Sequence, residues 1–357
     1  MRKTLSKLSA VCTLALAFLV LPVFAAFATE LEHWPAEAKA GIMKMIEANA
    51  NKGAYAVFDM DNTSYRYDLE ESLLPFMEMK GYITRDKIDP SLNLIPFKDT
   101  DEYKETLQSY YWRLCEIEDL VCYPWVAQIF SGYTLAQLKT YVDELIAYAK
   151  PVPIKYWSGD KVEDGEVNPP KIFTGMTELY NVLMENGIEV YVISAASEEL
   201  VRMVASDPKY GYNVKPENVF GVNMLLKNVD TGELVNSRFQ IKEGKYDQKA
   251  NQALLLTPYL VNPMTWYEGK YATIVGWIDQ WKRPVLVGGD TPISDGYMLL
   301  NGVDVDKGGV RVWVNRKASS MEAMEKWWKE CAESQKALGQ SQTADKNWIV
   351  VLPEDIQ

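Results

Sequence analysis

The chain has 357 residues, 48% of them hydrophobic and 24% charged, which is enough for one large folded unit or two medium ones. Its 49 acidic residues outnumber its 37 lysines and arginines, and the resulting charge of −12 argues against a nucleic-acid partner because it would repel a phosphate backbone. The single histidine, His33, argues against a histidine-based catalytic triad and against a zinc site built from histidine and cysteine.

The N-terminus has the pattern of an export signal. Three basic residues precede an apolar run from about residue 8 to residue 27, which ends in Ala26-Phe27-Ala28. This pattern predicts a signal peptide over residues 1–28, with an uncleaved membrane anchor as the alternative. No later stretch is long and apolar enough to span a bilayer, so we expect no membrane span after cleavage.

Three cysteines follow the predicted cleavage point. Export implies an oxidising compartment, so a Cys115–Cys122 disulfide is one expectation, with Cys331 left over. A continuous helix would hold Cys115 and Cys122 roughly 10 Å apart, which is too far for a bridge, so the disulfide requires a turn between them. The alternative is three free, buried thiols.

Hydrophobic periodicity and breaker residues predict an alternation of strands and helices. In chain order we expect a helix over 35–51, a buried strand over 54–58, a largely helical and irregular block over 65–172, a helix over 174–186, a strand over 188–193, a helix over 197–205, a hairpin of 219–226 with 233–239, a helix starting at 270, strands over 285–287 and 310–314, a helix over 321–337 and an edge strand over 347–352. This order predicts an α/β fold with a Rossmann-like parallel sheet.

Polar residues follow three of the predicted strands. Asp59 and Asp61 come after the first strand, Ser194 after the second and Asp290 after the third. Ligand sites in parallel sheets lie beyond the carboxyl ends of the strands. We therefore expect these residues, distant in sequence, to meet at one edge of the sheet.

Four segments resemble, in order, the motifs of the haloacid dehalogenase-like hydrolases. They are Val-Phe-Asp-Met-Asp-Asn-Thr at 57–63, Ser194 after a strand, Lys270 in a helix, and Gly-Asp-Thr-Pro-Ile-Ser-Asp at 289–295. Each alone could be a turn, a helix cap or a surface residue, but their joint order favours the family. The resemblance implies a core of residues 29–64 and 173–357, with a cap domain for substrate selection, 65–172, inserted after the first strand.

The resemblance also implies a role for each motif residue. Asp59 is expected to be the nucleophile that forms an aspartyl-phosphate, and Asp61 the acid and base. Asp59, Asp290 and the backbone carbonyl of Asp61 would hold Mg²⁺, or another divalent cation such as Zn²⁺. The residues expected to bind phosphate are Ser194, Lys270, Asn62 and Thr63. The residues expected to support them are Asp295, through a salt bridge to Lys270, and Thr291.

The predicted cap is rich in tyrosine and tryptophan and has acidic clusters at 68–71 and 116–119. Aromatic faces and carboxylates suit a quaternary ammonium group, although most of these rings must form the core of the cap, and we expect two to four to line a pocket. The motif spellings Asp-Met-Asp-Asn-Thr, Ser-Ala-Ala and Gly-Asp-Thr-Pro-x-Ser-Asp are similar to those of bacterial periplasmic phosphorylcholine phosphatases. That resemblance implies hydrolysis of a small-molecule substrate, phosphocholine, in the periplasm or outside the cell, and Glu71 is our choice for the carboxylate facing the ammonium.

Two alternatives remain open at this stage. The first is a broad-specificity periplasmic acid phosphatase acting on small phosphomonoesters. The second, of another class, is a non-catalytic choline-binding protein, although a pure binder would have no need of Asp61.

Overall fold

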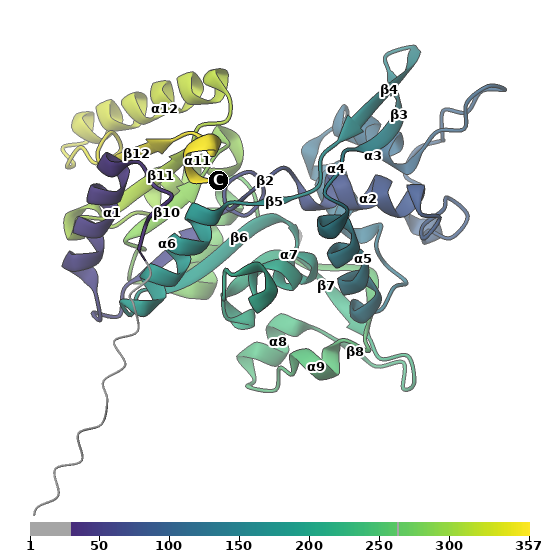
Figure 1. The fold of residues 1–357 in the computed structure, drawn as a ribbon, viewed down its shortest axis with the longest axis horizontal. Coiled ribbons are helices and arrows are strands. Elements are labelled where there is room, and N and C mark those ends of the chain that lie inside the picture. Colours follow the sequence, from purple (N-terminus) through teal and green to yellow (C-terminus); the bar gives the residue numbers. More distant parts are fainter. Residues whose placement is uncertain (1–29, 263) are drawn as a thin grey trace, which may run out of the picture.

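The computed structural model describes residues 30–262 and 264–357 (Figure 1). The predicted signal peptide at residues 1–28 lies outside the described residues. Within the part of the chain that is described, no helix combines the length and the apolar character that crossing a membrane requires.

The centre of the molecule is an eight-stranded sheet in the order β12-β11-β10-β1-β6-β7-β8, with β9 also pairing with β7. Its strands are β1 (Tyr55–Phe58), β6 (Glu189–Ser197), β7 (Val219–Lys227), β8 (Leu234–Val235), β9 (Leu255–Asn262), β10 (Leu286–Gly289), β11 (Val310–Val314) and β12 (Trp348–Val351). The strands from β12 to β7 pair in parallel, whereas β8 and β9 pair antiparallel with β7. The predicted Rossmann-like parallel core is confirmed, and the predicted edge strand is β12.

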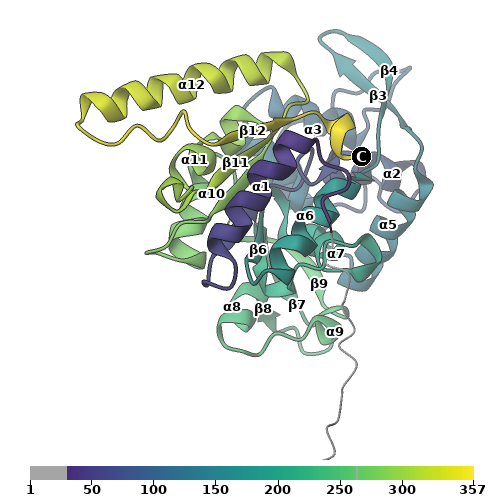
Figure 2. The ribbon, with the colours of Figure 1, turned by 60° about the vertical axis from the view of Figure 1, so that its left-hand side comes forward.

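Helices cover both faces of the parallel sheet, which explains why β1 is apolar at every position. Tyr55 and Val57 belong to a hydrophobic cluster with residues of α11 and α12, whereas Ala56 and Phe58 belong to a cluster with residues of α1 and α6. The helices of the core are α1 (Ala36–Asn49), α6 (Thr174–Glu185), α7 (Glu198–Ala205), α8 (Ser237–Lys242), α9 (Gln248–Asn251), α10 (Glu268–Thr273), α11 (Pro292–Asn301) and α12 (Ala318–Ala337). Figure 2 shows α1 lying across the sheet and the long α12 at the edge of the molecule. Burial on both faces is typical of parallel strands flanked by helices.

A largely helical segment is inserted between β1 and α6, and its helices form a separate group in Figure 1. It contains α2 (Leu69–Met79), α3 (Leu107–Cys115), α4 (Asp119–Gln128), α5 (Leu135–Tyr148) and the hairpin of β3 (Val152–Ser158) and β4 (Lys161–Val167). The chain leaves the core along β2 (Tyr65–Arg66) and returns along β5 (Lys171–Ile172), and these two strands pair antiparallel. The segment predicted to be the cap, 65–172, thus begins at β2 and ends at β5.

The structure corrects several of the predicted elements. The hairpin of β3 and β4 was expected to be irregular, because the prolines at 151 and 153 disguise its alternating pattern. The strand predicted over 233–239 ends at Val235, because the side chain of Asn236 accepts the N–H of Phe239 at 3.1 Å and starts α8 instead. Strand β9 was not predicted at all.

The structure contains the Cys115–Cys122 disulfide, with the two Cα atoms 5.0 Å apart. Cys115 is the last residue of α3 and Cys122 lies in α4, which begins at Asp119. The turn that the disulfide requires therefore lies at residues 116–118, and the expectation of a bridge is confirmed. Cys331 is free.

Candidate active site

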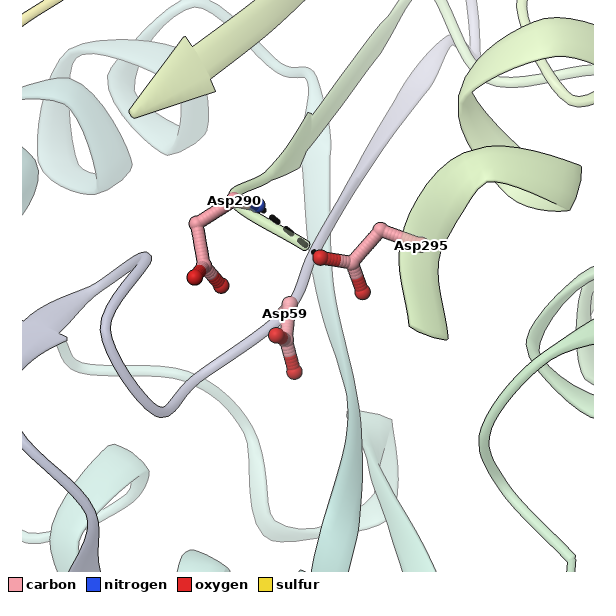
Figure 3. A group of neighbouring side chains, drawn as sticks. All are labelled: Asp59, Asp290 and Asp295. Carbon is pink, nitrogen blue, oxygen red and sulfur yellow. Dashed lines mark hydrogen bonds between the residues drawn. The ribbon is translucent and has the colours of Figure 1, made fainter. Parts of the chain in front are cut away.

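The carboxyl ends of β1 and β10 bring two aspartates together. The strands are paired in register from Ala56 to Phe58, and the N–H of Asp59 donates to the carbonyl of Gly288 at 3.1 Å. Asp290 follows the end of β10, so its side chain lies beside that of Asp59 (Figure 3). Carboxylate oxygens of Asp59, Asp290 and Asp295 all lie within 4.8 Å of one another, and all three residues are buried.

Lys270 lies between two members of this cluster, Asp59 and Asp295, and is fully buried. Its Nζ is 2.6 Å from Oδ1 of Asp59 and 2.6 Å from Oδ1 of Asp295. Burial alone would lower the pKa of Lys270, but the charges of Asp295 and Asp59 outweigh it and raise the pKa, so the side chain stays an ammonium. Burial, and then repulsion from Asp295, raises the pKa of Asp59, and Lys270 opposes that rise.

Asp295 positions its neighbours, and both of its carboxylate oxygens accept hydrogen bonds. Its Oδ1 accepts Lys270, and its Oδ2 accepts the backbone N–H groups of Asp290 and Thr291, both at 2.9 Å. Asp295 is the first-turn acid of α11, and Figure 3 shows it pointing back toward the end of β10. The structure thus places the predicted Asp295–Lys270 salt bridge and shows that Asp295 also fixes the backbone of the loop that carries Asp290.

Asp290 is held by three side-chain donors. The hydroxyl of Thr63 donates to Oδ1 at 3.0 Å, the hydroxyl of Thr291 donates to Oδ2 at 2.9 Å, and Nε of Arg316 donates to Oδ2. Thr63 was expected to bind phosphate, but in the structure its hydroxyl is directed at Asp290. Thr291 has the supporting position that was expected for it.

Asp61 and Asn62 shape the loop after β1. Oδ1 of Asp61 accepts the N–H of Leu69, the first residue of α2, at 2.8 Å. Asn62 has a φ of 60°, a left-handed conformation that asparagine tolerates, and its side chain accepts the N–H of Tyr67 at 3.0 Å. Burial, followed by the charge of Asp68, raises the pKa of Asp61 well above its usual range, which favours the protonated form that the predicted acid role requires.

Ser194 lies inside β6, because that strand continues past the predicted end at 193 to Ser197. Its side chain is fully buried, and its hydroxyl accepts the N–H of Ala196 at 3.2 Å. The neighbouring Ala195 and Ala196, rather than Ser194, line the cavity described next. The second motif therefore borders the cavity through Ala195 and Ala196 and not through the serine.

A cavity of about 160 Å³ opens over this cluster. Its wall carries six carboxylates, the two tyrosines Tyr111 and Tyr123, and Arg316. The carboxylates are those of Asp59, Asp61, Asp68, Glu70, Glu71 and Asp290. Asn62 and Thr291 also line it, so the cavity joins the motif residues of the core to α2, α3 and α4 of the inserted segment.

The acidic and aromatic wall comes from the inserted segment. Glu70 accepts the N–H of Ser197 at 2.8 Å, which ties α2 to the end of β6. Burial, and then the charge of Asp68, raises the pKa of Glu71 from 4.5 to about 8, and a hydrogen bond with Tyr111 opposes that rise. Tyr111 and Tyr123 are the two cap aromatics on the described cavity wall, in line with the expected two to four.

The carboxylates at the sheet edge can hold a hard divalent cation. Asp59 and Asp290 face each other across the sheet edge (Figure 3), and Mg²⁺ prefers oxygen ligands of this kind. Among the described residues, Oδ2 of Asp59 has no hydrogen-bond donor, whereas both oxygens of Asp295 are occupied. Asp59 thus offers an oxygen to which no described residue donates, and the carboxylate of Asp290 lies beside it, so these two side chains can hold a metal at the sheet edge. Asp295 holds Lys270 and the loop that carries Asp290.

Sequence reasoning missed several residues of the cavity. Arg316 lies two residues after the end of β11, so a search for polar residues beyond the carboxyl ends of the parallel strands would have found it. Asp68 and Glu70 were noticed only as part of an acidic cluster. Tyr123 carried no signal that distinguished it from the other aromatic residues of the cap.

Comparison with known proteins gives two matches of interest, whereas no family model matches the chain. The chain is 64% identical over 344 residues to the phosphorylcholine phosphatase of Pseudomonas aeruginosa (strain PAO1), covering 96% of this chain and 98% of that protein. The structure of a conserved protein of unknown function from Anaerococcus prevotii DSM 20548 matches with a TM-score of 0.55 and 20% identity, covering 84% of this chain and 90% of that one. The second match shows a shared fold.

Together with the fold and the carboxylate cluster, the first match makes this chain a phosphoric monoester hydrolase. Identity at this level over nearly the whole of both chains also fixes the family. The chain belongs to the phosphorylcholine phosphatase family, which confirms the resemblance that its motifs indicated.

Proposed function

We propose that this protein hydrolyses phosphocholine to choline and phosphate, with Mg²⁺ as cofactor and an aspartyl-phosphate on Asp59 as intermediate. The observation that carries the proposal is a single cavity lined by two chemically different groups of side chains. Asp59 and Asp290 come from the sheet edge, with Lys270 buried behind Asp59, and Glu71 and the two tyrosines come from the inserted segment. The relative's activity, at 64% identity, supports the same assignment.

The reaction follows from two aspartates in the loop after β1. Oδ2 of Asp59, which has no donor among the described residues, attacks phosphorus while Asp61 gives its proton to the departing choline oxygen. Asp61, now a carboxylate, then takes a proton from water, whose oxygen attacks the phosphoryl group and releases phosphate and Asp59. Lys270 favours the ionised form of Asp59 and orients it through its 2.6 Å contact.

A divalent cation held by Asp59 and Asp290 would neutralise the phosphoryl oxygens as the negative nucleophile approaches. Mg²⁺ suits the all-oxygen ligand set best, and Zn²⁺ is a second candidate. Without such a charge, the carboxylates of the cluster would repel a phosphate dianion.

The residues for choline recognition come from α2, α3 and α4. A quaternary ammonium group has no N–H to donate, so it is recognised by aromatic faces and by carboxylate charge. Tyr111 and Tyr123 offer the former and Glu71 the latter. An ammonium beside Glu71 would lower the raised pKa of that carboxyl group and so favour its charged form.

We also propose that the protein works outside the cytoplasm, in the periplasm or beyond. The export signal predicted at residues 1–28 and the Cys115–Cys122 disulfide both support this location. Cell fractionation with an antibody to the mature chain tests it directly.

The test of function is phosphate release from phosphocholine, phosphoethanolamine and phosphoserine, with Mg²⁺ or with EDTA, for wild type and Asp59→Asn. We expect phosphocholine to be preferred, and activity to be lost in EDTA and in Asp59→Asn. Equal rates on the three esters would instead indicate the broad-specificity phosphatase. Unchanged choline affinity in Asp59→Asn, with no phosphate released by either form, would indicate the binding protein.

A further inference from the structure

We propose that Arg316 binds the phosphoryl group of the substrate directly and so sets the orientation of the substrate in the cavity. The inference rests on the proposed function for the identity of the substrate. Arg316 lies two residues beyond the end of β11, next to the edge where Asp290 follows β10. Its side chain is 24% exposed and forms part of the cavity wall.

Two nitrogens of Arg316 are already anchored, which leaves the third for a ligand. Nε donates to Oδ2 of Asp290, and Nη2 donates to the hydroxyl of Thr291 at 3.0 Å. Nη1 has no hydrogen-bond partner among the described residues. A guanidinium held on one edge presents its remaining N–H groups in a fixed direction, so little entropy is lost when they bind an oxyanion.

The charges around the cavity point to the same role. Among the described residues, Arg316 is the one basic side chain on the cavity wall, facing six carboxylates. Lys270 is fully buried behind Asp59 and already contacts two carboxylates. A phosphomonoester dianion entering this cavity therefore meets one protein cation that is not fully buried, and it is Arg316.

Arg316 lies close to carboxylates of both the core and the inserted segment. Its charge acts on Asp59 and Asp290 of the sheet edge, and also on Asp68 and Glu71. Phosphocholine is a zwitterion, and without a fixed cation its ammonium could settle against the aspartates of the sheet edge. A guanidinium bonded to Asp290 attracts the phosphoryl group to the sheet edge and repels the ammonium from it, so it favours the productive orientation.

The competing explanation is that Arg316 acts only on the protein, by holding Asp290 in place for the metal. The two roles differ in what binds less tightly when the guanidinium is removed. A positioning residue would change the affinity for Mg²⁺ and leave the phosphate affinity of the metal-saturated protein unchanged. A phosphoryl ligand changes the affinity for phosphate at saturating metal.

The test is calorimetric titration of wild type, Arg316→Lys and Arg316→Gln with inorganic phosphate at saturating Mg²⁺, and with Mg²⁺ alone. The matched control is Arg283→Gln, because Arg283 precedes β10 at the opposite end of the strand from Asp290. Arg316→Lys keeps the positive charge and removes the planar guanidinium group. It provides a second test of the proposal if the Arg316→Gln variant does not fold.

We expect phosphate affinity to fall about 10- to 100-fold in Arg316→Gln, as for loss of a hydrogen bond to a charged group, and by less in Arg316→Lys. Choline titrated alone should bind with unchanged or tighter affinity in Arg316→Gln. Phosphate affinity within about threefold of wild type in both variants would overturn the proposal. If wild type does not hydrolyse phosphocholine, the proposed function fails, while the phosphate titration still decides the role of Arg316.

Discussion

The motif and the structure imply different roles for Thr63, and the substitution Thr63→Val distinguishes between them. The motif implies phosphate binding, whereas the buried hydroxyl donates to Oδ1 of Asp290 at 3.0 Å. Valine keeps the shape of the side chain and removes only the donor. The change therefore asks whether Asp290 depends on that one hydrogen bond.

The magnitude follows from how Asp290 is held. Thr291 and Arg316 both donate to Oδ2, so Thr63 is the one side-chain donor to Oδ1 among the described residues. Hydrogen bonds to charged groups contribute about 1.5–3 kcal/mol, so the metal-free variant should be less stable by about 2 kcal/mol. Loss of a partner that orients a metal ligand usually costs about 10- to 100-fold in metal affinity, and we expect a decrease in that range.

The assays are urea unfolding in EDTA and calorimetric titration with Mg²⁺, for wild type, Thr63→Val, Thr63→Ser and a matched control. Thr63→Ser keeps the donor and should retain the metal affinity. The control is Thr140→Val on the exposed face of α5, where the hydroxyl donates only to the carbonyl of Ala136. That substitution should change the free energy of unfolding by less than about 0.5 kcal/mol.

One result would refute this reasoning. If Thr63→Val bound Mg²⁺ as tightly as wild type but bound inorganic phosphate more weakly, Thr63 would be a phosphate ligand, as the motif alone implies. Asp290 would then be oriented sufficiently by its Oδ2 contacts.

Three further predictions concern the acid, a buried glutamate and the disulfide. Asp61→Asn should slow phosphate release roughly 100- to 10,000-fold without changing Mg²⁺ affinity, as measured by rapid quench and calorimetry; a loss of metal affinity would contradict the acid/base role. Burial raises the pKa of Glu78 from 4.5 to about 7, so the folded protein binds a proton at this carboxyl group more tightly than the unfolded chain does. The free energy of unfolding of the wild type should therefore decrease by at most about 3 kcal/mol as the pH rises from about 4.5 to about 7. Glu78→Gln should flatten that part of the pH profile in urea unfolding, and an unchanged profile would contradict the shift. Replacing Cys115 and Cys122 by serine opens a short loop and should cost about 2 kcal/mol of unfolding free energy; equal stability with and without reductant in wild type would argue against that estimate.

Local sequence was sufficient for the framework of this protein. The apolar run before Asp59 and the alternation of strands with helices predicted a parallel core, because strands buried on both faces must be apolar throughout. Ligand sites in such sheets lie at the carboxyl ends of the strands, so the sequence alone predicted that Asp59 and Asp290 lie close together. Those predictions depend only on backbone direction, which short-range patterns determine.

Some errors arose where proline weakened a local pattern. Strand β9 contains Pro258 and was missed, and the hairpin of β3 and β4 was disguised in the same way. Proline lacks an N–H and is confined to the edges of sheets, so sequence reasoning counts it against a strand. Whether an edge position is available depends on the neighbouring strands, which lie far away in the sequence.

The sequence by itself determined the order of the motifs, the α/β class and the two aspartates that we propose as the catalytic residues. Only the tertiary structure decided that Thr63 faces Asp290, that Ser194 lies beneath the cavity, and that Arg316 joins its wall. The physical reason is that the direction of a side chain is set by packing between segments that are far apart in the sequence. Local hydrophobic periodicity carries no information about that packing.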